Sequence, residues 1–424
     1  ANPIPVDRAE GIYFWDADGK RYIDFSSQLM NTNIGHQHPK VVKAIQDQAG
    51  KLCFVHPGNA TDVRGLLGKK LSEVTPGNLK KTFYSLGGSE ANENAIKMAR
   101  FYTGRHKILA RYRSYHGATH GSIALTGDYR RLAVEPSMPG GVHFLDPFCY
   151  RCPFGQKPES CKRECISHLE EVIKYEGPDK IAAIIMEGVV GSNGIIVPPD
   201  DYFPLVRDIC TKHEVLFIAD EVITGFGRTG EWFALKHWNV KPDILAFAKA
   251  ITSGYAQLGG IQLSDEIRET METAPDTEAY MHGFTYSGHA MACAVGLKNL
   301  EIMEQEDFPK RARDLGKRLL EVLGGIDLEL ARGDREPMPM RRAAPRAKQR
   351  RVREHARPVG LRQLRELAQL ERLYQRVQAD ALLDELDKLH KFEPPPTLVE
   401  EDLIGREIDD RGVAFDLPEI RVKR

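Results

Sequence analysis

Three short apolar segments of the chain each end in a charged residue, and they limit the folds that it can adopt. They are KIAAIIME (180–187), EVLFIADE (214–221) and DILAFAK (243–249). Near-continuous apolar runs of this kind are typical of parallel strands that helices cover on both faces. Residues 199–213, between the first two runs, carry apolar side chains at roughly helical spacing. The order strand, helix, strand predicts an α/β fold with a mostly parallel central sheet.

The three predicted strands end at Glu187, Asp220 and Lys249. Ligands of such sheets bind beyond the carboxyl ends of the strands, where we expect these side chains to converge. A lysine ammonium beside a buried strand is costly unless it is paired or neutralised. A lysine with a lowered pKa is a nucleophile that forms Schiff bases with carbonyl compounds, of which pyridoxal phosphate is the commonest. Lys249 is therefore our candidate for a covalent link to this cofactor.

A pyridoxal phosphate site also needs a carboxylate for the ring nitrogen, an aromatic face and a phosphate cradle. Asp220 is the candidate carboxylate, and the alternative is an ordinary solvent-facing aspartate at a strand end. Gly88 and Ser89 lie where a helix begins, and its N-terminus could bind phosphate, although Ser89 could also serve only as the N-cap. Tyr115 could stack on the ring.

Two other patterns carry less weight. His116 and His120 have the HxxxH spacing of a metal site, but Gly117 between them disfavours a helical pair. GFGRTG (225–230) fits the dinucleotide-binding pattern, but the acidic residues just before it would repel a pyrophosphate. We interpret this segment as a glycine-rich turn.

Further local patterns define elements outside the predicted sheet. Residues 11–25 predict a hairpin with its turn at Asp18 and Gly19, and residues 38–52 predict a helix. Residues 289–307 predict a long helix that could bridge to a second domain, with a border near residues 290–310.

Composition excludes several classes of protein. A chain of 424 residues, 42% hydrophobic and 28% charged, is ordinary for a soluble globular protein of roughly two domains. A net charge of −1 favours neither nucleic acid nor an anionic membrane, and no apolar run could span a bilayer. The first residues do not resemble a signal peptide and include no initial Met, so upstream residues could be missing. Seven cysteines, an odd number, favour a reducing, cytoplasmic location.

Four of the cysteines, Cys149, Cys152, Cys161 and Cys165, form the pattern C-x2-C-x8-C-x3-C. The spacing suits a tetrahedral thiolate site for zinc or an iron–sulfur cluster. Two local disulfides or four reduced thiols are the alternatives. In each case we expect an insertion at the surface or at a dimer interface, without a catalytic role.

Five motifs in the same order and spacing resemble the class III pyridoxal-phosphate aminotransferases of fold type I. They are GGSEANENAIKMAR, SYHGAT, IADEVITGFGRTG, AKAITSGYAQLGG and HGFTYSGHAMACA, and the resemblance extends over residues 11–304. It is strongest to the ω-transaminases, including the taurine– and β-alanine–pyruvate enzymes. It implies a large pyridoxal-phosphate-binding domain (46–295) and a small α/β domain built from both chain ends (1–45 and 296–424).

The resemblance also implies roles for individual residues. Lys249 would form the imine with the cofactor and then move the proton, and Asp220 would pair with the ring nitrogen. Thr285 would reach the phosphate bound to the neighbouring subunit, which implies a homodimer, or a dimer of dimers, with shared active sites. The implied cofactor site comprises Gly88, Ser89, Tyr115, His116, Glu187, Asp220, Val222, Lys249 and Thr285, and the implied substrate contacts are Met30 and Tyr115.

Several positions depart from the family pattern. Ile223 stands in place of a glutamine that binds the phenolic oxygen of the cofactor, Ala250 in place of a glycine, and Met30 in place of a tryptophan of the substrate pocket. Residues 325–395 lack the glycine-rich strand motif and a nameable carboxylate-binding arginine. Residues 331–380 contain thirteen arginines and one lysine against six acids. A solvated segment is our interpretation of this run, and nucleic-acid binding is the alternative.

These observations predict a transaminase that passes an amino group from an amine or ω-amino acid to a keto acid, with pyruvate as the expected acceptor, in a ping-pong cycle. An aminomutase or a decarboxylase on the same fold is the alternative, and a non-enzyme that binds nucleic acid or metal is a third reading. We expect no nucleic-acid partner and no membrane association. The amine donor is not readable from the sequence.

Overall fold

The computed structural model describes residues 3–324, which all belong to one compact unit, residues 1–332. The predicted C-terminal part of the small domain lies outside the described residues from residue 325 onward, as does the arginine-rich segment 331–380. The domain borders after residues 45 and 295 therefore stay predictions. Among the helices of residues 3–324, none combines the length and the apolar character that a membrane span requires.

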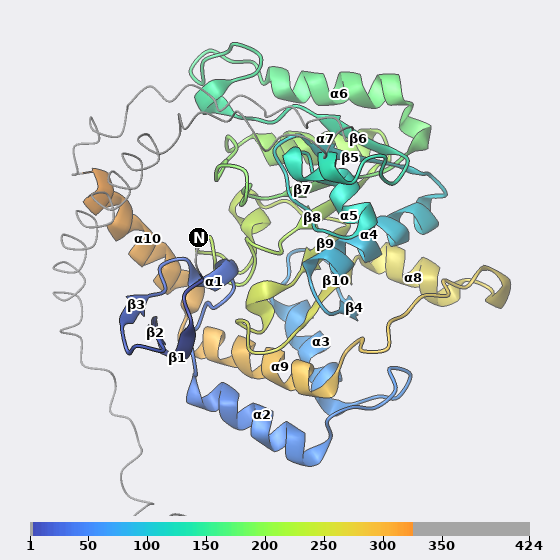
Figure 1. Ribbon diagram of the computed structural model, residues 1–424. Coiled ribbons are helices and arrows are strands. Elements are labelled where there is room, and N and C mark those ends of the chain that lie inside the picture. Colours follow the sequence, from blue (N-terminus) through green and yellow to red (C-terminus); the bar gives the residue numbers. More distant parts are fainter. Residues whose placement is uncertain (1–2, 325–424) are drawn as a thin grey trace, which may run out of the picture. The chain divides into compact units, whose positions relative to one another are not determined.

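A seven-stranded sheet forms the centre of this unit (Figure 1). Strands β9, β8, β7, β5 and β6 run parallel to one another, whereas β10 runs antiparallel to both of its neighbours, β4 and β9. The predicted mostly parallel sheet is confirmed, and the three predicted strands are the neighbours β7, β8 and β9. In order across the sheet the strands are β4 (Lys81–Ser85), β10 (Gly259–Leu263), β9 (Ile244–Phe247), β8 (Leu216–Asp220), β7 (Ile181–Glu187), β5 (Lys107–Arg111) and β6 (Gly141–Phe144).

Side chains of the central strands alternate between two apolar cores, one on each face of the sheet. In β9, Leu245 and Phe247 pack into one core, and Ile244 and Ala246 pack into the other. This double burial explains why the strands read as continuous apolar runs in the sequence. The first core includes residues of α3 (Asp62–Val74), α6 (Glu164–Glu176) and α7 (Tyr202–Lys212), and the second includes residues of α4 (Gly88–Thr103), α5 (His120–Leu125) and α8 (Asp265–Thr273).

A separate antiparallel sheet of β1 (Val6–Glu10), β2 (Tyr13–Asp16) and β3 (Arg21–Ile23) contains the predicted hairpin, which is confirmed. The Asp16 carboxylate closes its turn, because it accepts hydrogen bonds from the amides of Asp18 and Lys20 and from the Tyr22 hydroxyl. Gly19 adopts a φ of +80°, a conformation that favours glycine.

The remaining helices include both of those predicted outside the sheet. The helix predicted over residues 38–52 is α2 (Pro39–Lys51), and the one predicted over 289–307 is α9 (Ala290–Gln305). Helix α9 packs against α2 and α3 (Figure 1). The other helical elements are α1 (Ser27–Met30), α10 (Phe308–Gly324) and the short 3-10 turns Tyr129–Ala133, Cys149–Arg151, Pro178–Lys180, Ala234–Trp238, Lys249–Ile251 and Asp276–Glu278.

The clustered cysteines lie in the segment that precedes α6 and at the start of that helix. Cys149, Cys152 and Cys161 are partly exposed, and Cys165 is buried. All four are free thiols in this structure, which does not show the alternative of two local disulfides. Over residues 3–324, no three Cys, His, Asp or Glu side chains are arranged to hold a metal ion. The metal site stays a prediction.

Candidate active site

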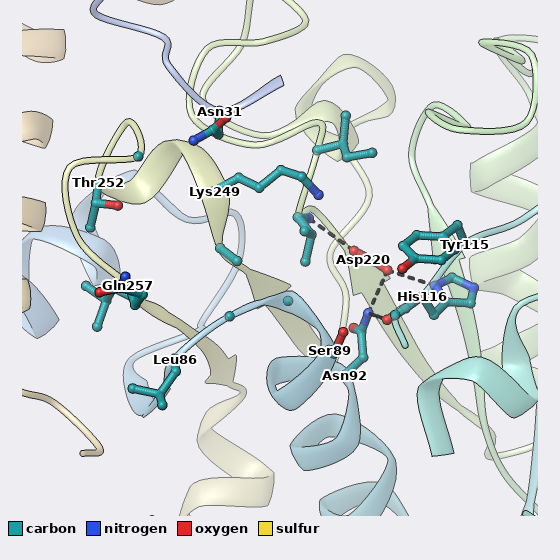
Figure 2. A pocket seen from close by; sticks show the side chains of 18 of the residues that line it. Asn31, Leu86, Ser89, Asn92, Tyr115, His116, Asp220, Lys249, Thr252 and Gln257 are labelled. Carbon is teal, nitrogen blue, oxygen red and sulfur yellow. Dashed lines mark hydrogen bonds and ion pairs between the residues drawn. The ribbon is translucent and has the colours of Figure 1, made fainter. Parts of the chain in front are cut away.

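A pocket of about 380 Å³ opens at the carboxyl ends of β7, β8 and β9 (Figure 2). It lies where the sequence predicts convergence, because parallel neighbouring strands end at the same edge of the sheet. Eight residues of the predicted cofactor site line it, namely Gly88, Ser89, Tyr115, His116, Glu187, Asp220, Val222 and Lys249.

Lys249 follows β9 after one residue and begins a short 3-10 turn. Its side chain extends into the pocket toward Asp220 and Tyr115 (Figure 2). Burial lowers the pKa of its ammonium, while the negative charges of Asp220 and Glu187 oppose that shift. Among residues 3–324, no atom forms a hydrogen bond or ion pair with Lys249 Nζ. The lysine is thus a partly buried amine with access to the pocket, and its surroundings favour the neutral form.

Asp220 is held at the end of β8 by hydrogen bonds to both carboxylate oxygens. Oδ2 accepts from Asn92 Nδ2 at 2.8 Å and from His116 Nδ1 at 2.7 Å, and Oδ1 accepts from the amide of Val222 at 3.1 Å. The side chain is 3% exposed. This geometry contradicts the alternative of a solvent-facing aspartate. His116 lies beside Asp220, and its Nδ1 carries the proton in this arrangement.

Asn92 is a residue of the site that the sequence interpretation missed. It is buried on α4 and also donates to the carbonyl of His116 at 2.7 Å. Both partners of Nδ2 are acceptors, which fixes the orientation of the amide. Its position one helical turn after Gly88 is the signal that was available, because residues four apart share a helix face. Missed residues that also line the pocket include Asn31, Leu86, Gly117, Thr252 and Gln257.

Glu187, at the end of β7, organises the main chain around the pocket. Its Oε1 accepts from the amide of Tyr115 at 3.1 Å, and its Oε2 accepts from the amide of Gly191 at 2.8 Å. Burial, and then the charge of Asp220, raises the pKa of this carboxyl. Glu187 therefore fixes the backbone that carries Tyr115, whose ring has the guanidinium of Arg130 at 4.0 Å from its centroid.

The N-terminus of α4 faces the same pocket. The helix begins at Gly88 with Gly87 as its N-cap, so the alternative that Ser89 is only the N-cap is wrong. Instead, the Ser89 hydroxyl accepts a hydrogen bond from the amide of Ala118 at 3.0 Å and joins α4 to the loop after Tyr115. A Cβ on Gly88 would approach Val222 Cγ1 to 2.7 Å, so only glycine allows this close contact.

Two residues of the predicted site do not line the pocket. Met30 is partly buried at the end of α1, next to the pocket residue Asn31. Thr285 is exposed in the segment before α9. The roles of both residues in substrate and phosphate binding therefore stay predictions.

The GFGRTG segment forms turns, as predicted, and a buried carboxylate fixes its surroundings. Glu221 accepts hydrogen bonds from the amides of Ala234 and Leu235, both at 3.0 Å, and from the Thr224 hydroxyl. Glu221 does not line the pocket, and burial raises the pKa of its carboxyl to about 7.

The family model described as aminotransferase class-III matches residues 1–330 of this chain. The chain belongs to the class III aminotransferases. This family is pyridoxal-phosphate-dependent and has fold type I, which agrees with the α/β architecture described above.

Relatives of this class III aminotransferase are named for more than one activity. A leucine/methionine racemase from Thermococcus litoralis is 39% identical, and the alignment covers 77% of this chain and 73% of the relative. A putrescine–pyruvate aminotransferase from Pseudomonas aeruginosa is 35% identical, with 73% and 69% covered.

Two solved structures are similar in both sequence and fold. The (S)-enantioselective ω-transaminase of Thermomicrobium roseum is 42% identical with a TM-score of 0.72, covering 76% of this chain and 73% of that one. The taurine:2-oxoglutarate aminotransferase of Bifidobacterium kashiwanohense, solved with pyridoxal phosphate and glutamate, is 42% identical with a TM-score of 0.71 and the same coverage.

The pocket of this class III aminotransferase fits pyridoxal phosphate. Within residues 3–324, Asp220 Oδ1 accepts one hydrogen bond from the protein, so the buried carboxylate keeps an acceptor position for a protonated ring nitrogen. Gly87 has open space where a Cβ would lie, beside the helix N-terminus that favours a phosphate. Lys249 would supply the amine for the aldehyde.

Replacing Gly117 with alanine tests the pocket loop that packs against Ser89 at the start of α4. A Cβ there would lie 2.4 Å from Ser122 Oγ and 2.8 Å from Ser89 Cα, and the glycine has a φ of +139°. We expect G117A to destabilise the protein by about 2–3 kcal/mol and to weaken cofactor retention, because both neighbours must move. Thermal melting and visible absorbance after dialysis measure the two effects.

G65A is the matched control for G117A. Gly65 lies in α3, and its Cβ would meet nothing within 4 Å. This variant should melt at or slightly above the wild-type temperature, since alanine is the better helix former. If G117A kept its cofactor and melted with the wild type, the tight packing of this loop would be refuted.

Glu221 predicts a specific pH dependence of stability. Its folded-state pKa of about 7 lies above the ordinary value of 4.5, so the folded protein binds this proton more tightly than the unfolded chain. The contribution to stability is complete below pH 4.5 and is lost as the pH rises to 7, by about 3 kcal/mol. Urea denaturation of the wild type and E221Q between pH 4.5 and 8 should show the difference between them changing by this amount. A difference independent of pH would contradict the assignment.

Proposed function

We propose that this protein is a transaminase that moves an amino group from an amine or ω-amino acid to a keto acid, with pyruvate as the acceptor, in a ping-pong cycle. The observation that carries the proposal is the facing pair of Lys249 and Asp220, one a partly buried amine with a lowered pKa and the other a buried carboxylate held by Asn92 and His116. The similarity to a putrescine–pyruvate aminotransferase supports pyruvate as acceptor.

The chain's own residues divide the work. When bound, pyridoxal phosphate supplies an aldehyde that exchanges amines and a protonated ring that withdraws electrons from the reacting carbon. Asp220 would keep the proton on the ring nitrogen. Lys249 Nζ would hold the aldehyde carbon and, once the substrate amine has displaced it, would be free to remove and return the substrate proton. The first amides of α4, at Gly88 and Ser89, would bind the phosphate.

Other residues orient these groups. Tyr115 would cover one face of the ring and Val222 would pack on the other. His116 holds Asp220, and Glu187 holds the Tyr115 backbone, through the hydrogen bonds described above. These four residues line the pocket, whereas Met30 would contribute to substrate binding through its place beside Asn31.

The proposal includes a cytoplasmic homodimer, or a dimer of dimers, with shared active sites. Thr285 reaches the phosphate bound to the partner subunit, and its exposure in the segment before α9 supports that role. Sedimentation of the pure protein tests the assembly. If the sites are shared, a mixture of K249A with a variant of Thr285, each inactive by itself, should regain activity. One site of the mixed dimer then contains both intact residues.

A racemase is the second candidate, because a relative at 39% identity is named leucine/methionine racemase. The same lysine can remove a proton from Cα and return it to the other face. Racemisation needs no keto acid, whereas transamination stops when the first substrate has converted the cofactor once.

Half-reaction assays separate the candidates. The pure protein with bound cofactor is mixed with one amine at a time, from a panel of putrescine, taurine, β-alanine, 4-aminobutyrate, L-leucine and L-methionine, and the cofactor absorbance is followed. Pyruvate or 2-oxoglutarate is then added. A transaminase gives a single stoichiometric spectral change that the keto acid reverses. D-amino acid formed without a keto acid indicates a racemase, carbon dioxide a decarboxylase, and an isomeric amino acid an aminomutase.

A further inference from the structure

The turn that carries Lys249 has an unusual backbone. Lys249 has a φ of +49° and Ser253 a φ of +48°, although neither is glycine. Left-handed conformations are disfavoured for residues with a Cβ and persist only where the surroundings hold them. Something outside the turn must therefore fix it.

One buried side chain of α9, that of Asn299, makes contacts that hold this turn. Asn299 Nδ2 donates to the carbonyls of Ala250 at 2.8 Å and Ile251 at 3.0 Å, and its Oδ1 accepts from Ser253 Oγ at 2.8 Å. Asn299 is 0% exposed. It thus bonds to three of the four residues that follow Lys249.

An asparagine at position 299 is better suited to holding this turn than to the interior of a helix. Asparagine is a poor helix former, and a buried amide is costly unless its donors and acceptor are satisfied. Here they are satisfied only by the turn and by a weak contact to Met303 among the described residues. The Ala250 carbonyl, which also accepts from the amide of Ser253 at 3.2 Å, gains a second donor, and the Ile251 carbonyl gains a side-chain donor.

Helix α9 gives this contact a rigid support. On another side it packs against α2 through an apolar cluster of Val41, Val295 and Ile302. Ser253 Oγ also lies 3.4 Å from the amide of Ile34, in the segment after the pocket residue Asn31. The turn is therefore tied to the helical layer and to the N-terminal wall of the pocket.

We propose that Asn299 is a positioning residue for the reaction, which holds the turn after β9 so that Lys249 Nζ points into the pocket toward Asp220. This inference rests on the proposed role of Lys249. Asn299 does not line the pocket, so its effect acts only through the turn.

N299A tests the proposal, and I302A is the matched control. Ile302 is equally buried on α9 but packs toward α2 instead of the turn. Both variants remove a buried side chain from the same helix, so both lower the melting temperature. The first measurement uses cofactor-free protein: competitive acetylation with acetic anhydride from pH 6 to 11, with the Lys249 peptide quantified by mass spectrometry.

In the wild type, we expect Lys249 to be half-labelled at a lower pH than ordinary lysines, because its pKa is lowered. In N299A this midpoint pH should rise toward that of ordinary lysines, because the amine becomes more exposed to water. I302A should label like the wild type. With cofactor and the best amine donor, N299A should lose kcat by about 10- to 100-fold with KM within about twofold, since misplacement of the base affects the chemical step.

A folded N299A that labels and turns over like I302A would overturn the proposal. If N299A does not fold, S253A decides, because it removes the bond to Asn299 Oδ1 together with only one longer contact, that of Ser253 Oγ with the Ile34 amide at 3.4 Å. It should shift the labelling in the same direction by a smaller amount, and wild-type labelling of a folded S253A would refute the inference. The labelling needs neither cofactor nor turnover, so it stands even if the transaminase assays fail.

Discussion

Replacing Lys249 with alanine is expected to lower kcat by on the order of 10⁴-fold or more. The variant loses both the nucleophile that binds the cofactor aldehyde and the base that moves the substrate proton, and each function alone is worth several powers of ten. The side chain points into the pocket, and no other lysine lines it among residues 3–324. Single-turnover absorbance with an amine donor measures the effect.

A second measurement identifies the covalent link directly. Borohydride treatment with pyridoxal phosphate should add the mass of the reduced cofactor to the peptide that contains residue 249 of the wild type, and this label should be absent from K249A. K298A is the control, because Lys298 lies on α9 outside the pocket and pairs with Glu301. Full activity of K249A, or labelling of another lysine in the wild type, would refute the assignment.

The same variant should change how stability depends on pH in the absence of cofactor. The folded-state pKa of Lys249 lies below its ordinary value of 10.5. Its contribution to stability is therefore complete above pH 10.5 and is lost as the pH falls through the folded-state pKa. K249A lacks this loss, so its stability relative to the wild type should increase from pH 11 toward pH 7.

The second large effect is expected for D220N, with kcat lower by on the order of 10²–10³-fold. The variant keeps the size of the side chain but removes its charge. Asn92 Nδ2 and His116 Nδ1 both donate to the Oδ2 position, so the new carbonyl oxygen must lie there. The new NH₂ then faces the amide of Val222 and the pocket, where it cannot accept a hydrogen bond from the protonated ring nitrogen.

D146N is the matched control for D220N. Asp146 is also a fully buried carboxylate beyond a strand end, but it pairs with Arg113 and does not line the pocket. Both variants lower stability, and only D220N should lower kcat and change the pH titration of the cofactor absorbance. Equal losses of kcat in the two variants would mean that Asp220 acts only through stability.

Part of the site could be predicted from short stretches of sequence, because each buried parallel strand is a recognisable run of neighbouring residues. A strand buried on both faces is a continuous apolar run, and its last residue marks the edge of the sheet. The sequence alone therefore predicted that Glu187, Asp220 and Lys249 lie close together. The helix start at Gly88 was visible in the same way, although the role of Ser89 as a bridge to Ala118 was not.

The contacts that hold these groups in place were beyond the sequence. Asn92 reaches Asp220 across 128 residues, and Asn299 reaches Ala250 across 49. No periodicity marks an asparagine as a partner of a distant carboxylate or carbonyl. The polar side chain of a helix meets either a distant partner or water. The outcome depends on which strand the helix packs against and on its rotation about its own axis.

The sequence by itself thus determined the chemistry, since residue types and strand ends are encoded over a few neighbouring positions. Tertiary structure alone decided the electrostatics and the orientation. Burial that lowers the pKa of Lys249, and the donors that aim Asp220, arise only when distant segments exclude water together.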